Sequence, residues 1–400
     1  MMNILFIIGK YPNYGGTEKI TTVLANCFSK KGCLVAIASF EQPKPELASE
    51  LDHRIKLIRL SYPVKSASNV KIIRKCIKEN KIDVILNQWC LPFMVTQLIN
   101  RARKNSDAKL ISVLHGVPDR SKKLIVAEDR VKSTSGIPKL LNKIKLKLTD
   151  YVIRYSCKYV YDNSDKYVVL SDAFISSFSE YSGKKDISKL VAIGNPITIA
   201  TDYSTDYLPL KKNRILYVGR LDLENKRVNR IIETWELIAN KFHDWSLHLV
   251  GDGPHRSDLE QYVKTHKIKN VFFHGFIQEE PTEFYKESKI LMLTSDLEGF
   301  GLVIVEAMSY GVVPVVYGSY SSVYDIIKSG EDGMITSPPF SKETTARVLS
   351  ELIENEKRLQ KLSVNAQDKS KTFDLESTIQ QWHELFDVFK KHVKTTNYEE

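Results

Sequence analysis

The sequence predicts an α/β protein with two Rossmann-like domains, each built on a doubly wound parallel β-sheet. The chain of 400 residues is too long for one ordinary hydrophobic core and suits two domains of roughly 150 to 200 residues each. Short apolar runs alternate with helical stretches in both halves, which is typical of βαβ units. A polar segment at residues 194–212 interrupts this alternation and marks a linker. We therefore expect domains at residues 1–195 and 196–374, followed by a terminal helix at 375–400.

The first half begins with an apolar run at residues 3–8, which predicts a buried strand, and continues through a Gly-Gly loop into a helix at 17–31. Later runs predict strands at 33–39, 83–87 and 109–115 and a helix at 69–79. The second half predicts strands at 214–219, 246–251, 271–275, 290–294 and 312–317 and helices at 228–239, 256–266, 281–287 and 302–310. An amphipathic helix that carries Trp382, Leu385, Phe386 and Phe389 ends the chain. Ligands of such sheets bind at the carboxyl ends of the strands.

The composition indicates a cytoplasmic protein. The first residues lack a basic leader with a small-residue cleavage site, and no apolar run approaches the roughly 20 residues that span a bilayer. None of the five cysteines lies in a C-x-x-C pair or at zinc-binding spacing, which favours buried, reduced thiols. A peripheral position on the inner face of the cytoplasmic membrane stays open.

The charge is distributed unevenly along the chain. Residues 1–200 hold 33 Lys and Arg against 17 Asp and Glu, whereas the second half holds 25 against 31. The basic half favours an anionic partner, either a membrane leaflet or a lipid-linked substrate, and a solvated basic face is the alternative. Nucleic acid is not expected, because no nucleic-acid motif appears and the cations are not interleaved with aromatic residues. Residues 138–148 form a basic amphipathic helix that could lie on a membrane, although such helices more often pack on their own domain.

Three loops carry residue types that suit an anionic ligand. Gly15 and Gly16 precede a helix, where glycine lets the backbone approach a diphosphate and the helix amides attract it; Glu18 follows in the first turn. Gly219-Arg220 and Lys226-Arg227 place cations after a strand, where they would neutralise a diphosphate.

The most informative segment runs from Thr294 to Met308. Gly299 and Gly301 lead directly into a helix, so that the backbone amides there can bind an anion. Glu298 precedes this helix, and Glu306 lies about two turns further on roughly the same face. A carboxylate within so apolar a helix requires a partner, because a buried unpaired charge is costly. The pair suits hydrogen bonds to hydroxyl groups on two parts of one ligand.

Residues 298–314, with the sequence Glu-Gly-Phe-Gly-Leu through Glu306-Ala-Met to Pro314, resemble the signature of glycosyltransferase family 4, the retaining GT-B enzymes. The motifs at 15–18, 115–116, 217–221, 250–254, 274–276 and 325–333 follow in family order. The resemblance implies a GT-B fold, with two Rossmann-like domains that face each other across a cleft. It also implies that the last helix returns to the first domain.

The resemblance further implies a role for each matching residue. Gly16 lies near the donor diphosphate, with Gly15 and Gly219 beside it, and Arg220 and Lys226 stabilise the diphosphate as it leaves. Glu298 and His115 contact the transferred sugar, and Glu306 binds the ribose. The main chain at Phe276 meets the nucleobase, and the amides of Phe300, Gly301 and Leu302 lie by the sugar and phosphate.

Two positions depart from the family pattern. The family often has Lys-Gly where this chain has Lys226-Arg227, so Arg227 could replace or supplement a phosphate contact. The linker reads Gly194-Asn-Pro-Ile, a variant associated with UDP-hexose and UDP-N-acetylhexosamine enzymes. No Asp-x-Asp motif appears in the donor region, which predicts catalysis without metal or other cofactor.

The resemblance implies a retaining transferase in which an oxocarbenium–diphosphate ion pair forms on one face of the sugar, rather than a covalent glycosyl-enzyme. The acceptor is expected to be a glycan or lipid-linked sugar of bacterial surface-polysaccharide assembly. Its contacts are expected from Glu18 and from the basic loop 116–136, through Arg120, Lys122 and Lys123. A nucleotide-sugar 2-epimerase and a non-catalytic sugar-binding relic are the alternatives.

Overall fold

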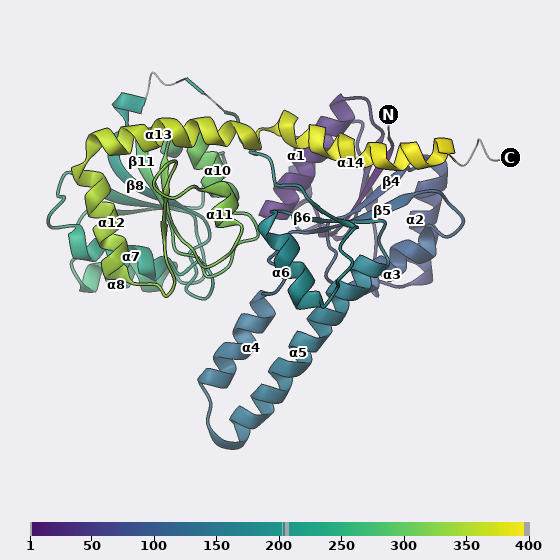
Figure 1. The fold of residues 1–400 in the computed structure, drawn as a ribbon, viewed down its shortest axis with the longest axis horizontal. Coiled ribbons are helices and arrows are strands. Elements are labelled where there is room, and N and C mark those ends of the chain that lie inside the picture. The colour runs from purple at the N-terminus through teal and green to yellow at the C-terminus, as the bar shows by residue number, and fades with distance from the viewer. Residues whose placement is uncertain (1, 202, 205–207, 396–400) are drawn as a thin grey trace. The chain divides into compact units, whose positions relative to one another are not determined.

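The computed structural model of the protein describes residues 2–201, 203–204 and 208–395, with side chains described as far as residue 390. It divides into two compact units, which Figure 1 shows as ribbons. Unit 1 comprises Met1–Asn195 together with Glu376–Glu400, and unit 2 comprises Pro196–Leu375.

Unit 1 contains a seven-stranded, entirely parallel sheet with the strand order β3-β2-β1-β4-β5-β6-β7. The strands are β1 (Ile4–Lys10), β2 (Val35–Glu41), β3 (Lys56–Arg59), β4 (Val84–Asn87), β5 (Lys109–Leu114), β6 (Lys166–Val169) and β7 (Leu190–Ala192). The helices are α1 (Gly16–Lys30), α2 (Ala67–Glu79), α3 (Phe93–Ala102), α4 (Lys122–Lys132), α5 (Gly136–Asp162), α6 (Ala173–Ser182) and α14 (Leu375–Thr395), with a 3₁₀ turn at Pro45–Glu50. This is the doubly wound topology that the sequence predicted.

Unit 2 repeats the topology with six parallel strands in the order β10-β9-β8-β11-β12-β13. The strands are β8 (Lys212–Val218), β9 (Ser246–Val250), β10 (Val271–Gly275), β11 (Ser288–Leu293), β12 (Val313–Tyr317) and β13 (Met334–Thr336). The helices are α7 (Val228–Ile238), α8 (Arg256–Thr265), α9 (Thr282–Glu287), α10 (Leu302–Ser309), α11 (Val323–Ile326), α12 (Lys342–Glu354) and α13 (Glu356–Ser370), with 3₁₀ turns at Leu208–Leu210 and Lys371–Phe373.

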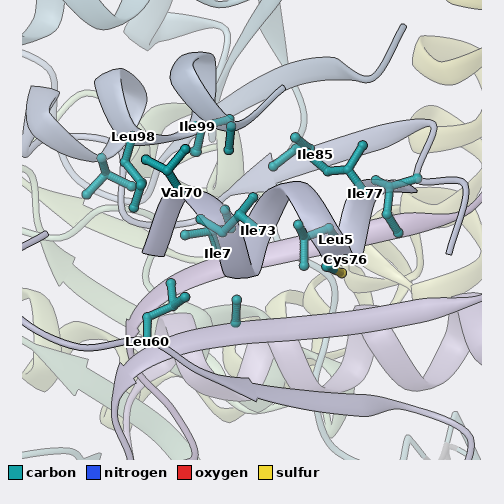
Figure 2. Close-up of a cluster of buried hydrophobic side chains, with 14 of the residues drawn as sticks. Leu5, Ile7, Leu60, Val70, Ile73, Cys76, Ile77, Ile85, Leu98 and Ile99 are labelled. Atoms are coloured by element: carbon teal, nitrogen blue, oxygen red, sulfur yellow. The ribbon is translucent and has the colours of Figure 1, made fainter. Parts of the chain in front are cut away.

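The core of unit 1 shows why its first strand reads as a continuous apolar run. Leu5 and Ile7 on β1 face one side of the sheet and pack with Ile73 of α2 and Leu98 of α3, as Figure 2 shows. The alternate residues of β1 face the other side and are buried as well. A strand that is covered on both faces carries apolar residues at every position.

The last helix, α14, packs on α1 within unit 1. Phe386 lies 5.7 Å from Phe28, measured between ring centroids, and Lys31 forms an ion pair with Glu376 at 2.8 Å. Trp382 and Leu385 are buried on the same face of α14. The helix therefore joins the core of the unit in which the chain begins.

A helical hairpin corrects one expectation from the sequence and refines another. The stretch 116–136 was expected to be a basic loop, but most of it is α4, which begins where the Ser121 side chain accepts a hydrogen bond from the Leu124 amide. Residues 138–148 do pack on their own domain, but through one side only, which lies against α4. These residues belong to the long helix α5, and Leu140 and Ile144 are exposed because only the opposite side of α5 faces α4.

The five cysteines are buried and unpaired in the structure, as expected for reduced thiols. Within the part of the chain that the structure describes, no helix combines the length and apolar character needed to cross a membrane.

Candidate active site

Each sheet has one point at which the strand order reverses, and ligands of doubly wound sheets bind there, at the carboxyl ends of the central strands. In unit 1 the reversal lies between β1 and β4, and in unit 2 between β8 and β11. The loops that follow these four strands hold most of the residues predicted to be functional. Each unit therefore has one candidate binding region.

In unit 2, the loop after β8 lies directly against the loop after β9. The Gly219 amide donates to Val250 O at 2.9 Å, and the Leu221 amide donates to Asp252 O at 3.0 Å. A Cβ atom on Gly251 would lie 1.9 Å from the carbonyl oxygen of Gly219, so a larger residue would push the two backbones apart. This contact determines where the chain turns at Arg220.

Arg220 is the most accessible cation of this loop. Its side chain is 60% exposed, and its Nε lies 3.9 Å from Asp222 Oδ2, which is a loose ion pair. The buried Asp222 organises the rest of the turn, because its Oδ1 accepts hydrogen bonds from the amides of Asn225 (2.8 Å) and Lys226 (2.9 Å). Hydrogen bonds hold the base of the loop, and the Arg220 guanidinium is accessible to an anion.

Lys226 and Glu298, predicted separately from the sequence, lie in contact. Lys226 Nζ donates to Glu298 Oε1 at 2.5 Å, and the Ser295 hydroxyl donates to the same oxygen at 2.7 Å. Both charged side chains are largely screened from solvent, which strengthens their attraction. Arg220, Asp222, Lys226, Ser295 and Glu298 are called the charged cluster below.

Arg227, in contrast, is held by protein groups. Its Nε forms an ion pair with Asp296 Oδ2 at 2.6 Å, and Asp296 Oδ1 is paired with Arg230 at the same distance. The Arg227 backbone is left-handed, with φ 52° and ψ 43°. This conformation favours glycine, the residue that the family often has here. The geometry therefore favours a structural role for Arg227, and a contact with the donor stays a prediction.

The N-terminus of α10 lies next to the charged cluster in sequence. Gly299, Phe300 and Gly301 connect Glu298 to this helix, and no side chain caps the first turn that begins at Leu302. Its first amides are therefore suited to an anionic ligand. The ring of Phe300 is buried against Phe373 and fixes the course of the loop.

Glu306 lies in a separate polar contact on α10. Its side chain is buried, and its two oxygens accept hydrogen bonds from the hydroxyl groups of Thr198 (2.5 Å) and Tyr285 (3.2 Å). Burial and the charge of Glu306 raise the pKa of Tyr285 well above its usual value, so Tyr285 remains a donor. The partners that the sequence required for this carboxylate are two hydroxyl groups; the ribose contact stays a prediction.

Unit 1 has a pocket of about 300 Å³ at the ends of β1, β4 and β5. Polar and apolar groups share its wall: Lys10, Thr17, Glu18, Tyr62, Gln88, Trp89, Cys90, His115 and Gly116 are among the lining residues. We call it the strand-end pocket.

His115 lies in this pocket in contact with Gln88. Its Nε2 makes a short hydrogen bond to Gln88 Oε1, an arrangement that suits the tautomer with the proton on Nε2 because an amide oxygen can only accept. Burial lowers the pKa of His115 to about 4, so the ring is neutral at pH 7. A neutral, oriented imidazole suits positioning of a hydroxyl group better than donation of charge.

The other predicted residues of unit 1 lie around this pocket or on the hairpin. Gly15 precedes α1 in extended conformation (φ 164°), Gly16 is the first residue of that helix, and Glu18 is a half-buried residue whose pKa is raised by burial. Arg120 lies 3.6 Å from Glu128, and Lys122 and Lys123 are exposed on the first turn of α4. Neither lysine lines the strand-end pocket.

Phe276, the remaining predicted residue, directly follows β10 in unit 2, and its ring is exposed. The expected contact between its main chain and a nucleobase stays a prediction.

Besides Asp222 and Ser295 of the charged cluster, the sequence analysis missed two buried polar residues, Gln88 and Tyr320. Gln88 is buried, and its Nε2 has no hydrogen-bond partner among the described residues. The same holds for the Tyr320 hydroxyl, whose pKa is raised by burial and by the nearby charge of Glu298. Each follows a central strand of its sheet, β4 or β12, and this position was the available signal.

Comparison with known families identifies the chain. Residues 14–200 match the profile of Glycosyltransferase Family 4, and residues 205–369 match that of Glycosyl transferases group 1. The chain belongs to this family of glycosyltransferases. The strand-end pocket and the charged cluster thus lie in the two halves that these profiles describe.

Two relatives that illustrate the family match over nearly their full length. An uncharacterized glycosyltransferase of Haemophilus influenzae is 25% identical over 391 residues, covering 96% of this chain and 99% of the relative. A Campylobacter jejuni α-1,4-N-acetyl-D-galactosaminyltransferase is 26% identical, with 96% of this chain and 98% of the relative covered.

Solved structures show the same fold. HepE of Anabaena, in complex with UDP and glucose, superposes with a TM-score of 0.73 at 19% identity, covering 97% of this chain and all of that one. The lipopolysaccharide outer core galactosyltransferase WaaB gives a TM-score of 0.68 at 20% identity, covering 98% and 100%. The fold of this glycosyltransferase is GT-B, as the sequence predicted.

Proposed function

We propose that this glycosyltransferase is a retaining enzyme that transfers a hexose or N-acetylhexosamine from a UDP-sugar to a glycan or lipid-linked acceptor. The observation that carries the proposal is the charged cluster at the strand-order reversal of unit 2. It combines an accessible cation, Arg220, with the Lys226–Glu298 pair beside an uncapped helix N-terminus. The cations and backbone amides suit binding of a diphosphate, and the carboxylate suits hydrogen bonds from sugar hydroxyl groups.

In the proposed reaction, the bond between the anomeric carbon and the diphosphate oxygen breaks first. Arg220, Lys226 and the amides of α10 stabilise the negative charge that develops on the leaving diphosphate. The acceptor hydroxyl attacks the same face of the sugar, which retains the configuration, and its proton passes to the departing diphosphate oxygen. Glu298 holds sugar hydroxyl groups and forms no covalent bond.

Unit 1 is proposed to bind the acceptor. Its strand-end pocket contains the neutral His115, oriented by Gln88, together with Glu18. The Campylobacter jejuni relative acts, by its name, on a glycan linked to PP-undecaprenol, and an Erwinia amylovora relative (22% identical over 393 residues) is named for amylovoran biosynthesis. These names support a role in bacterial surface-polysaccharide assembly, with a lipid-linked acceptor at the cytoplasmic face of the membrane.

A thermal-shift screen across UDP-, GDP- and ADP-sugars tests the donor class. A ligand that binds only the folded state raises the unfolding temperature with its concentration. We expect a shift with a UDP-hexose or UDP-N-acetylhexosamine; a shift with GDP- or ADP-sugars alone would contradict the proposed nucleotide. The donor is further expected to react as well in excess EDTA as without it, since no metal is assigned a role.

Arg220→Ala tests the charged cluster directly. We expect turnover to fall by about a hundredfold or more, because the leaving diphosphate loses a charge-assisted contact. Arg347→Ala on α12, which also removes an exposed arginine of unit 2, is the matched control and should keep full turnover. Near-normal turnover in Arg220→Ala would rule out the assignment.

A further inference from the structure

Helix α5 exposes a continuous apolar stripe on the side that faces away from α4. Ile137, Leu141, Ile144 and Leu148 are 76%, 53%, 50% and 57% exposed, and Leu140 and Tyr151 extend the stripe at 61% and 68%. These six residues are called the outer face of α5. Asn142, Leu146 and Thr149 on the opposite side are half-buried. Contiguous exposed apolar surface of this kind marks an interaction site.

The hairpin that presents this face is anchored in unit 1. The C-terminal part of α5 is buried at Cys157 and Val160, and Phe93 of α3 packs against Tyr155 with ring centroids 5.4 Å apart. From this base α4 and α5 extend away from the sheet of unit 1, as Figure 1 shows. The exposed apolar residues therefore belong to a well-anchored element.

Lysines border the outer face. Residues 136–149 contain four lysines and no acidic residue. At 100° per residue, Lys143 and Lys147 flank one edge of the stripe and Lys145 flanks the other. An interfacial helix has this composition, since its apolar face enters the acyl boundary while lysines along the edges reach anionic headgroups.

A second copy of the chain is the competing occupant, because Ile137, Leu141, Ile144, Leu148 and Tyr151 repeat at the 4-3 spacing of a coiled coil. The flanking charges oppose this pairing. Lys145 and Lys147 lie beside the seam, so two copies would bring like charges together. Leu140 and Val152 also widen the stripe beyond the narrow seam that a coiled coil uses.

We propose that the outer face of α5 docks on an anionic membrane, with the helix lying in the plane of the interface. The functional reason for this docking rests on the proposed lipid-linked acceptor. The exposed apolar and basic residues that support the docking do not depend on that proposal. Only residues 116–121 separate His115, at the end of β5, from the start of α4. A hairpin bound to the membrane therefore presents the strand-end pocket to an acceptor carried by the same membrane.

Vesicle flotation at low salt tests the docking. The wild type should float with vesicles that contain phosphatidylglycerol and much less with pure phosphatidylcholine. The variant Leu141→Gln/Ile144→Gln/Leu148→Gln should reduce the bound fraction about tenfold or more, because three apolar side chains no longer enter the interface. The matched control, Leu210→Gln/Leu237→Gln/Val364→Gln, changes three exposed aliphatic residues of unit 2 and should float like the wild type.

A second variant, Lys143→Glu/Lys147→Glu, keeps the outer face and reverses two flanking charges. It should lose binding to the anionic vesicles to a similar degree, and this loss is expected even if the glutamine variant fails to fold. Undiminished flotation of either folded variant would overturn the proposal. Light scattering tests whether a second copy of the chain covers the outer face of α5. If the wild type is a dimer, the glutamine variant is a monomer and flotation is unchanged, the outer face is a dimer interface and not a membrane-docking surface.

The flotation experiment can fail or succeed independently of the test of the proposed function. Both variants should retain the thermal shift with the UDP-sugar, because unit 2 is untouched. If no UDP-sugar binds the wild type but flotation follows the outer face of α5, the proposed function fails and the docking stands.

Discussion

The two candidate binding regions occupy equivalent positions on similar sheets, yet their chemistry differs. The charged cluster of unit 2 contains the Lys226–Glu298 ion pair and the accessible Arg220. The strand-end pocket of unit 1 has a neutral histidine and a buried amide at its centre, with Lys10 and Glu18 among the surrounding residues. The difference supports the proposed division of tasks, in which unit 2 stabilises charge and unit 1 orients an uncharged hydroxyl group.

Removal of a charge from unit 2 should have the largest effect. In Lys226→Ala, we expect turnover to fall by about a hundred- to a thousandfold, since a cation is lost where negative charge develops. The steady-state rate of UDP release in the presence of acceptor measures this loss.

Two comparisons control the Lys226 experiment. Lys289→Ala in unit 2 removes a lysine that is paired with Glu356 instead of Glu298 and should keep normal turnover. A Lys226→Ala enzyme that retained wild-type turnover would contradict the proposed task of the charged cluster.

A change at Gln88 should have a smaller effect on turnover and act through orientation. Gln88→Leu removes the acceptor for His115 Nε2, so we expect kcat to fall about ten- to a hundredfold as the imidazole loses its position. The KM for the donor should change little, because Gln88 is expected to act through the orientation of His115 and not through a donor contact of its own.

Gln88→Glu keeps an acceptor oxygen at the same place and should restore most of the lost kcat. A rise in donor KM in Gln88→Leu, with kcat preserved, would show that Gln88 binds the donor instead of orienting His115.

The sequence predicted those elements of the fold and of the candidate site that depend on local patterns. Strand β1 was recognisable because both of its faces are buried, and Glu298 through Glu306 because glycines, a helix and carboxylates occur at fixed spacing. Gln88 follows β4 without any motif, so its significance emerges only when the fold brings His115 beside it. Short strands such as β3, whose side chains are mostly exposed, lack an apolar run and were not predicted.

The hairpin of α4 and α5 also shows what local sequence patterns cannot predict. Helix α4 begins at Lys122 and has one buried residue, Leu124, so its apolar periodicity is too weak to separate it from a basic loop. The amphipathic pattern of α5 was visible, but a pattern cannot tell which face will be covered. The covered side is the one that carries Asn142, whose amide donates to Arg130 O of α4 at 3.4 Å.

The pKa of His115 allows a third test of the contrast between the charged cluster and the uncharged strand-end pocket, by the pH dependence of stability. With a pKa of about 4 in the folded state and about 6.5 when unfolded, this histidine gains a proton on unfolding between these two values. Stability should therefore fall as the pH is lowered from about 6.5 towards 4, with a contribution of at most about 1.4 kcal/mol per pH unit. Urea unfolding of the wild type and of His115→Gln across this range measures the difference in slope.

Gln88→Glu sharpens the pH test. A carboxylate beside the imidazole should raise the pKa of His115, which an NMR titration of the histidine Cε1 signal would detect. A wild-type His115 signal that already titrated near 6.5 would contradict the neutral character of the strand-end pocket.

Substitution of Arg227 should have the smallest effect on turnover, because Arg227 neighbours Lys226 but is paired with Asp296. It distinguishes a structural arginine from one that binds the diphosphate. Arg227→Gly and Arg227→Ala remove the same ion pair, and only alanine must keep the left-handed backbone with a Cβ atom. We expect the glycine variant to be the more stable by about 1 kcal/mol in urea unfolding, with turnover of both variants near that of the wild type. Equal stabilities would show that the loop relaxes without the arginine. A turnover loss in both variants as large as in Lys226→Ala would instead place Arg227 on the diphosphate, and the charged cluster would then extend by one residue.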